Sequence, residues 1–120
     1  MAKTVKLKRI YEAPAPSDGM RILVDRLWPR GIAKDKAKID LWLKDIAPSD
    51  ALRKRFHGHP EDWDEFRKAY AAELKQAGEA VKELREHLRT GTVTLLYAAR
   101  DEEHNNAVAL KQWLTRRRGV

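Results

Sequence analysis

The chain of 120 residues carries 25 lysines and arginines against 18 aspartates and glutamates, a formal net charge of +7 at pH 7, and it has no cysteine. The lack of cysteine excludes disulfides, thiol nucleophiles and thiolate metal sites. No apolar run approaches the roughly 20 residues of a membrane-spanning helix, and no apolar signal core follows the first methionine, so we expect a cytoplasmic protein without a membrane partner.

The first 25 residues predict two strands separated by a loop. Val5 and Leu7 alternate with lysines, which is typical of a half-buried or edge strand. Two prolines and an Asp-Gly pair predict a loop at 12–19. The run 20–25 contains three consecutive aliphatic residues and predicts a central strand that is buried on both faces.

The middle of the chain leaves one assignment open. Pro29 ends the preceding strand, and the lysine-rich run 32–38 predicts one helical turn. Residues 39–43 alternate at period two, which favours a third strand. Ile39, Leu43 and Ile46 also fit one face of a helix, so strand and helix both remain possible for 39–46.

The second half predicts three helices and a strand. Ser49 suits the N-cap of a short helix at 50–56. Pro60 suits the first turn of one long helix, because apolar residues recur from 63 to 88 at steps of three and four. Gly78 is the position at which this helix could be weakened or bent. The run 92–97 is apolar on both faces and predicts another central strand, followed by a helix that reaches about residue 114.

This order of elements predicts the fold class. Strands that alternate with helices indicate a three-layer α/β domain with a mainly parallel sheet of about four strands flanked by helices. The length fits a single domain over 1–120, with a basic tail from about residue 115.

A polar string follows each predicted central strand, from Asp25 to Gly31 and from Arg100 to Asn106. Ligands of open α/β sheets bind beyond the carboxyl ends of the strands. We therefore expect a polar pocket there that binds a small anionic ligand such as a nucleotide. Its ligand-binding residues would be Arg26, Trp28, Arg30, Tyr97, Arg100 and Asn105.

A small enzyme is the alternative interpretation of the same residues. Histidine is the residue type best suited to general acid–base catalysis near neutral pH, so His104 is the candidate acid or base, and Asp101 or Asp25 could fix its tautomer. Serine chemistry is disfavoured, because neither Ser17 nor Ser49 lies in a G-x-S-x-G motif.

Both strings also have a purely structural interpretation. Asp101 suits the N-cap of the last helix, with Glu102 and Glu103 in its first turn. These three acids would also repel an anion unless they point away from it. In the other string, Pro29 and Gly31 would simply set the backbone of a turn.

We expect neither a metal nor a cofactor. His57 and His59, with Asp62 or Asp64, are metal-ligand types, but two histidines in a loop before a helix are far more often incidental. No GxGxxG motif and no P-loop is present.

The positive charge leaves a third function open, a nucleic-acid-binding module. Basic clusters at Lys3–Arg9, Arg53–Arg55 and Arg116–Arg118 predict weak, non-specific binding to phosphates. No helix-turn-helix, RNP, KH or zinc-finger signature indicates specific recognition. The oligomeric state stays unknown from the sequence.

Long, unusual strings in the chain resemble one known family. They are VDRLWPRG from Val24, WLKDIAPS from Trp42, and TLLYAARD from Thr94 followed by HNNA from His104. These strings are similar to those of the YeaO-like family of small bacterial proteins, a domain family of unknown function. The resemblance implies a single bacterial cytosolic α/β domain and assigns no residue a role.

Overall fold

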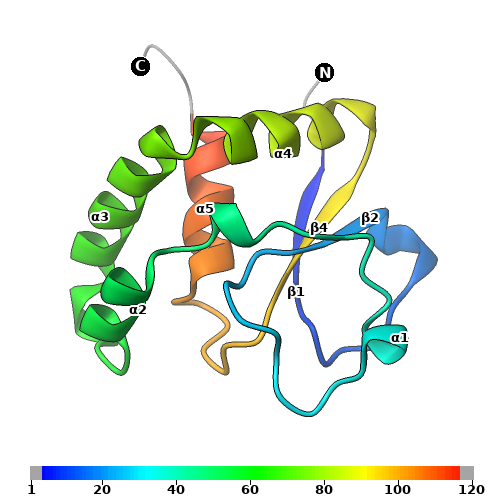
Figure 1. Ribbon diagram of the computed structural model, residues 1–120, viewed down its shortest axis with the longest axis horizontal. Helices are drawn as coiled ribbons and strands as arrows, with labels where there is room; N and C mark the ends of the chain where they lie inside the picture. Colours follow the sequence, from blue (N-terminus) through cyan, green and yellow to red (C-terminus); the bar gives the residue numbers. More distant parts are fainter. Residues whose placement is uncertain (1–3, 117–120) are drawn as a thin grey trace.

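A four-stranded parallel sheet forms the centre of the protein in the computed structural model, which describes residues 4–116 (Figure 1). The strand order is β1-β4-β2-β3. The strands are β1 (Val5–Arg9), β2 (Met20–Leu23), β3 (Leu41–Trp42) and β4 (Val93–Tyr97). The helices are α1 (Lys34–Ala37), α2 (Asp50–Phe56), α3 (Trp63–Gln76), α4 (Gly78–Thr90) and α5 (Asn106–Thr115). Short 3₁₀ turns are η1 (Pro16–Asp18), η2 (Lys44–Ile46) and η3 (Pro60–Asp62). The predicted α/β domain with a parallel sheet is thus confirmed.

β4 lies in the middle of the sheet because it can be buried on both faces. All five of its residues are buried. It pairs with β1 on one side, Val5 opposite Val93, and with β2 on the other, Ile22 opposite Leu95. This confirms the two central strands expected from the uninterrupted apolar runs.

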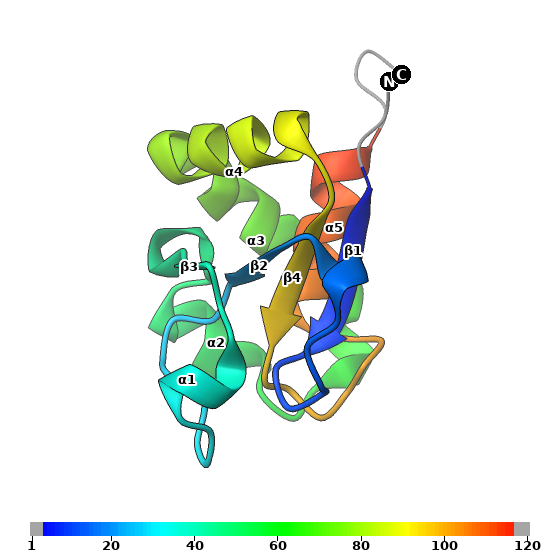
Figure 2. The same cartoon turned by 90° about the vertical axis from the view of Figure 1, so that its right-hand side faces the viewer.

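The two faces of the sheet are covered very unequally. One face carries a large apolar cluster that includes Ile22, Leu95 and Leu84, and α2, α3, α4 and α5 supply its other side. The opposite face carries a small cluster of Ile10, Leu23, Ala37 and Leu96. Figure 2 looks onto this second face, where α1 and loops are the cover; α3 and α5 lie behind the sheet, and α4 runs across the top of the view. We call it the α1 face.

The predicted long helix over 63–88 is wrong in its continuity. It is two helices, α3 and α4, which meet at Ala77. Ala77 has ψ 45°, outside the helical range, while its N–H still donates to the carbonyl of Leu74 at 3.1 Å. Both helices bury their apolar residues in the same core, so the periodic pattern runs on across the break.

Residues 39–46, for which the sequence left strand and helix undecided, contain a short strand and a 3₁₀ turn. Leu41 and Trp42 pair with β2 as a two-residue edge strand, and η2 follows at once. The predicted helix 50–56 is confirmed, with Ser49 as its N-cap: Ser49 Oγ accepts the N–H of Leu52 at 3.1 Å. Within residues 4–116 no helix is both long and apolar enough to span a bilayer.

A buried ion pair lies under the α1 face, where β2 begins. Arg21 Nη1 donates to Asp18 Oδ2 at 2.6 Å, and both side chains are only 5% exposed. Arg21 also donates to the backbone carbonyls of Ala37 and Lys38, at 2.7 and 3.0 Å. One guanidinium therefore joins η1, β2 and the end of α1.

Candidate functional site

All four strands are parallel, so their carboxyl ends lie along one edge of the sheet. Each strand ends in a cation or is followed by one within three residues. These cations are Arg9 after β1, Arg26 after β2, Lys44 after β3 and Arg100 after β4. Arg9 and Arg26 are fixed by backbone carbonyls: Arg9 bonds Ala98 and Ala99, and Arg26 bonds Ala47 and Pro48. We call this region the carboxyl edge.

The partly buried carboxylate of Asp25 ties β2, β4 and α5 together at the carboxyl edge. Its Oδ2 accepts the N–H of Ala98 at 3.0 Å, just beyond β4. Its Oδ1 accepts the amide of Asn106 at 3.0 Å, and the same amide donates to the carbonyl of Val24 at 2.9 Å. A structural role for Asp25, as the partner of an arginine in a turn, was one interpretation of the sequence. The partners that the structure shows, Ala98 and Asn106, were missed.

The pH dependence of stability should report this carboxylate. Burial raises the pKa of Asp25, although the bonds from Asn106 and Ala98 and the charge of Arg53 oppose the shift. The folded state therefore keeps this proton to higher pH than the unfolded chain. The contribution of Asp25 to the free energy of unfolding must then fall as pH rises from the unfolded pKa of about 3.9 through the raised native value.

We expect the stability of the wild type minus that of Asp25→Asn to fall with rising pH over this window. The slope cannot exceed about 1.4 kcal/mol per pH unit, the limit for one proton. Urea unfolding of both proteins from pH 4 to pH 7 measures it. A difference that rises with pH would contradict the raised pKa.

The predicted N-cap of the last helix is wrong. α5 begins at Asn106, and its N-cap is the buried Asn105, whose Oδ1 accepts the N–H of Val108 at 2.9 Å. The Asn105 amide donates to the carbonyl of Asp101 at 2.8 Å. Asp101 instead caps its own loop, since its Oδ1 accepts the N–H groups of Glu103 and His104 at 2.9 and 3.0 Å. The same Asn105 side chain affects Tyr97. Burial, followed by the nearby charges of Glu102 and Glu12, raises the pKa of Tyr97, whereas Arg9 and the side-chain hydrogen bond with Asn105 oppose the shift.

His104 and Asp101 form an exposed pair on this loop. Asp101 Oδ2 lies 3.0 Å from His104 Nδ1. The backbone N–H groups of Glu103 and His104, followed by the His104 ring, hold the pKa of Asp101 below its usual range. The His104 ring packs edge-on against Trp63 of α3, with centroids 5.3 Å apart. The arrangement can orient an imidazole whose other nitrogen is left for a ligand or a proton.

The nine predicted site residues, six for ligand binding and three for catalysis, do not all lie on one face of the sheet. Tyr97, and the Trp63 ring that His104 contacts, belong to the large cluster under α3 and α5. Trp28 packs against the small cluster of the α1 face. Its indole N–H donates to the carbonyl of Ile32 at 2.8 Å. Arg30 and Arg100 are exposed. The structure therefore brings together Asp25 with Ala98 and Asn106, and Asp101 with His104 and Asn105.

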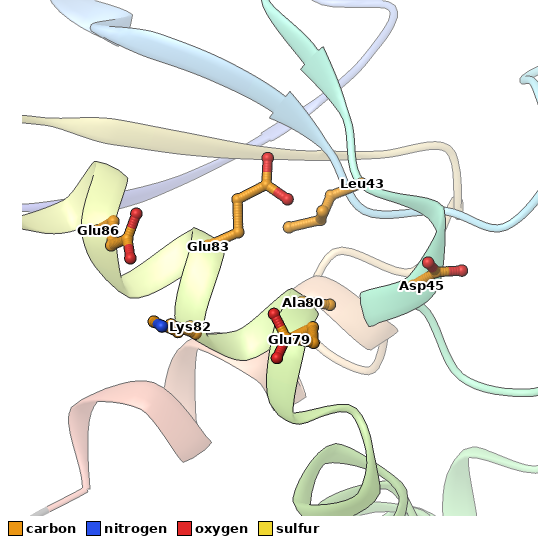
Figure 3. A pocket seen from close by; sticks show the side chains of 7 residues that line it. All are labelled: Leu43, Asp45, Glu79, Ala80, Lys82, Glu83 and Glu86. Atoms are coloured by element: carbon orange, nitrogen blue, oxygen red, sulfur yellow. The ribbon is translucent and has the colours of Figure 1, made fainter.

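Two hollows in the described residues lie away from most of these side chains. The larger, about 280 Å³, is lined by Asp45 and by Glu79, Glu83 and Glu86 of α4, with Leu43, Ala80 and Lys82 (Figure 3). Four carboxylates against one lysine make it unsuitable for an anion. The smaller, about 160 Å³, includes Arg26 among residues of η2 and α3. Neither is the predicted nine-residue pocket.

The loop before α3 brings three possible metal ligands together. Ligand atoms of His59, Glu61 and Asp62 lie within 4.8 Å of one another. His59 Nδ1 is 3.1 Å from Glu61 Oε2, so the two exposed side chains pair with each other. This set shares His59 and Asp62 with the combination weighed from the sequence. The expectation of no metal stays a prediction.

Comparisons with known proteins agree over nearly the whole chain. The model of a family described as the inactive DUF488-N3 subclade matches residues 4–118. The uncharacterized protein YeaO of Escherichia coli K12 is 46% identical over 110 residues, which cover 92% of this chain and 96% of that protein. The uncharacterized proteins Mb3100c of Mycobacterium bovis and Rv3073c of Mycobacterium tuberculosis are each 42% identical over 113 residues, covering 94% of this chain and 95% of each relative. No solved structure matches the chain.

Proposed function

Since the chain belongs to the DUF488-N3i family, described as the inactive DUF488-N3 subclade, and is similar to YeaO, we propose that it binds a small anionic ligand, such as a nucleotide, without transforming it. The binding site would be the carboxyl edge of the sheet. The observation that carries the proposal is the cation at the end of every strand, Arg9, Arg26, Lys44 and Arg100. The family description supports binding rather than catalysis.

The geometry supports an anion at this edge despite the acids nearby. Arg9 and Arg26 are held by backbone carbonyls, which fixes the position of their positive charges. Within residues 4–116 neither of the two forms an ion pair with a carboxylate. Asp101, the acid closest to Arg100 in the chain, turns its carboxylate toward its own loop and His104. Charge-assisted bonds from arginines to phosphate or carboxylate are stronger than neutral hydrogen bonds.

Thermal unfolding with a panel of nucleoside mono-, di- and triphosphates, pyrophosphate and citrate tests the proposal. A ligand that binds only the native state stabilises it by about 2.7 kcal/mol at 100 times its Kd, which raises Tm by several degrees. We expect Arg100→Gln to weaken binding about ten-fold or more, because it removes one charge-assisted bond.

Arg89→Gln is the matched control, because Arg89 lies just before β4 begins, at the other end of the strand. It should leave the ligand-induced rise in Tm unchanged. The proposal fails if no anion raises Tm, or if both variants lose the rise equally.

The second candidate is a small enzyme that uses His104 as general acid or base. The 3.0 Å contact of Asp101 Oδ2 with His104 Nδ1 favours it. A carboxylate that accepts the proton-bearing Nδ1 fixes the tautomer of the ring and leaves Nε2 to exchange a proton with a substrate. Incubating the protein with a bacterial metabolite extract distinguishes the two candidates. An enzyme depletes one compound and His104→Asn abolishes the loss, whereas a binding protein depletes none beyond its own molar amount.

A further inference from the structure

Residues 26–44, most of which cover the α1 face, are rich in positive charge. This segment has six cations and two acids, so it holds a net charge of +4. Five of the cations are Arg30, Lys34, Lys36, Lys38 and Lys44. The sixth, Arg26, bonds the carbonyls of Ala47 and Pro48 and lines the smaller hollow beside α3, so it belongs to the other side of the sheet. The segment leaves β2, crosses the α1 face as loop and α1, and returns as β3 (Figure 2).

None of these six cations forms an ion pair among the described residues, where the pairs that exist involve other elements. Lys8 and Arg21 pair with Asp18, and Arg53 pairs with Asp50. Of the two acids in the segment, Asp40 accepts the backbone N–H of Arg21 at 2.8 Å. The segment therefore presents positive charge that the protein itself does not neutralise. The three basic clusters expected from the sequence have fewer free charges, since Lys8 and Arg53 are paired in this way. Their other members Lys3, Arg117 and Arg118 lie outside the described residues.

Two tryptophans lie among these cations. Trp28 and Trp42 pack edge to face, with ring centroids 5.4 Å apart. Their indole N–H groups donate to the carbonyls of Ile32 and Asp25, which fixes the orientation of both rings. Lys44 Nζ lies 4.1 Å from the centre of the Trp42 ring, and Lys34 Nζ lies 6.0 Å from that of Trp28. Both tryptophans are only partly buried, so part of each side chain reaches solvent.

We propose that the α1 face binds single-stranded nucleic acid through residues 26–44. Lysines would contact phosphates, and bases would stack on the tryptophans, displacing the lysine that now covers each ring. Proteins that bind single strands combine these two elements, a basic track for the backbone and aromatic rings for the bases. A duplex hides its base faces, so it can use only the lysines. This surface shares Lys44 with the proposed site for a small ligand, extends from there over the α1 face, and does not depend on Arg100.

The acidic hollow limits where a bound nucleic-acid strand can lie on this surface. Leu43 and Asp45, on either side of Lys44, belong to its lining together with Glu79, Glu83 and Glu86. Phosphates avoid such a row of carboxylates, so the bound strand runs from the α1 end of the segment and stops at Lys44.

The test is the affinity of the full chain for a fluorescent 12-nucleotide oligo-dT, measured by anisotropy across a salt series. The variant Lys34→Gln/Lys36→Gln/Lys38→Gln, at three exposed positions of the segment, should bind at least ten-fold more weakly at low salt. The slope of log K against log salt should fall by about 2, since each phosphate contact on a single strand contributes about 0.7. The control Lys54→Gln/Lys68→Gln/Lys75→Gln removes the same charge from exposed positions of α2 and α3. It should bind like the wild type.

Base stacking has its own readout. Oligo-dT should quench tryptophan fluorescence and bind more tightly than an abasic strand of equal length and charge, and more tightly than a duplex. The proposal is overturned if the wild type does not bind at low salt, if the control variant weakens as much as the α1-face variant, or if the abasic strand binds equally well. None of these variants changes Arg9, Arg26, Lys44 or Arg100, so small-ligand binding can fail while strand binding holds, and the reverse.

Discussion

Arg21→Met should lower the free energy of unfolding by about 3–5 kcal/mol, the usual cost of breaking a buried ion pair by removing one partner. The change leaves the carbonyls of Ala37 and Lys38 without their donors and leaves Asp18 with Lys8 as its remaining cation. Urea unfolding monitored by circular dichroism measures the loss.

Two comparisons separate this ion pair from a general effect of losing an arginine. Arg89→Met, at an exposed position of α4, should change stability by less than about 0.5 kcal/mol. Asp18→Ala/Arg21→Met should cost less than the sum of the two single changes, because the members of a contacting pair are not additive. Additive costs would mean that the two side chains act independently.

Gly19→Ala should destabilise the protein by about 3 kcal/mol or more, because backbone and not a movable side chain blocks the new methyl group. A Cβ at Gly19 would lie 2.3 Å from the carbonyl oxygen of Thr92. That oxygen accepts the N–H of Met20 at 3.0 Å, so relieving the clash also disturbs the start of the β2–β4 pairing. Gly19 in addition has φ 64°, in the left-handed region. Thermal and urea unfolding give the cost.

Gly31→Ala is the matched control for the clash. Gly31 has φ 78°, also left-handed, but a Cβ there meets nothing within 4 Å. It should cost only about 1 kcal/mol, the penalty for the left-handed conformation alone. Equal losses for the two variants would show that the Thr92 carbonyl moves away freely.

The elements were predictable where burial alone decides them. β4 is buried on both faces, so its sequence is continuously apolar and needs no knowledge of its neighbours. The break at Ala77 was not predictable from the same reasoning. α3 and α4 bury Leu74 and Val81 in one core, and the apolar spacing is the same whether the backbone continues or turns. Only the dihedral angles of Ala77 distinguish the two cases.

The carboxyl edge was predictable as a location and much less as an arrangement. Asp101 and Asn105 are both good N-caps, and the choice depends on where α5 must start. Asn106 reaches the carbonyl of Val24 and the carboxylate of Asp25, so the helix starts where this contact with another strand is possible. Tyr97 is the last residue of β4 and lies on the same face as Val93 and Leu95, as the alternation of a strand predicts. Trp28 lies five residues beyond the end of β2, where the loop decides which face its side chain reaches.

The position of β4 has a consequence for biosynthesis. β4 separates β1 from β2 in the sheet, and Val5 and Met20 both pair with Val93. Neither β1 nor β2 can therefore form this pairing before β4 has been synthesised. The β2–β3 contact of two residue pairs is the one pairing in the described sheet that does not need β4. At about 5–20 residues per second, translation leaves the apolar strands β1 and β2 without their central neighbour for several seconds. The complete sheet can form only after Tyr97 has left the ribosome. Until then the nascent chain exposes apolar surface of the kind that chaperones bind.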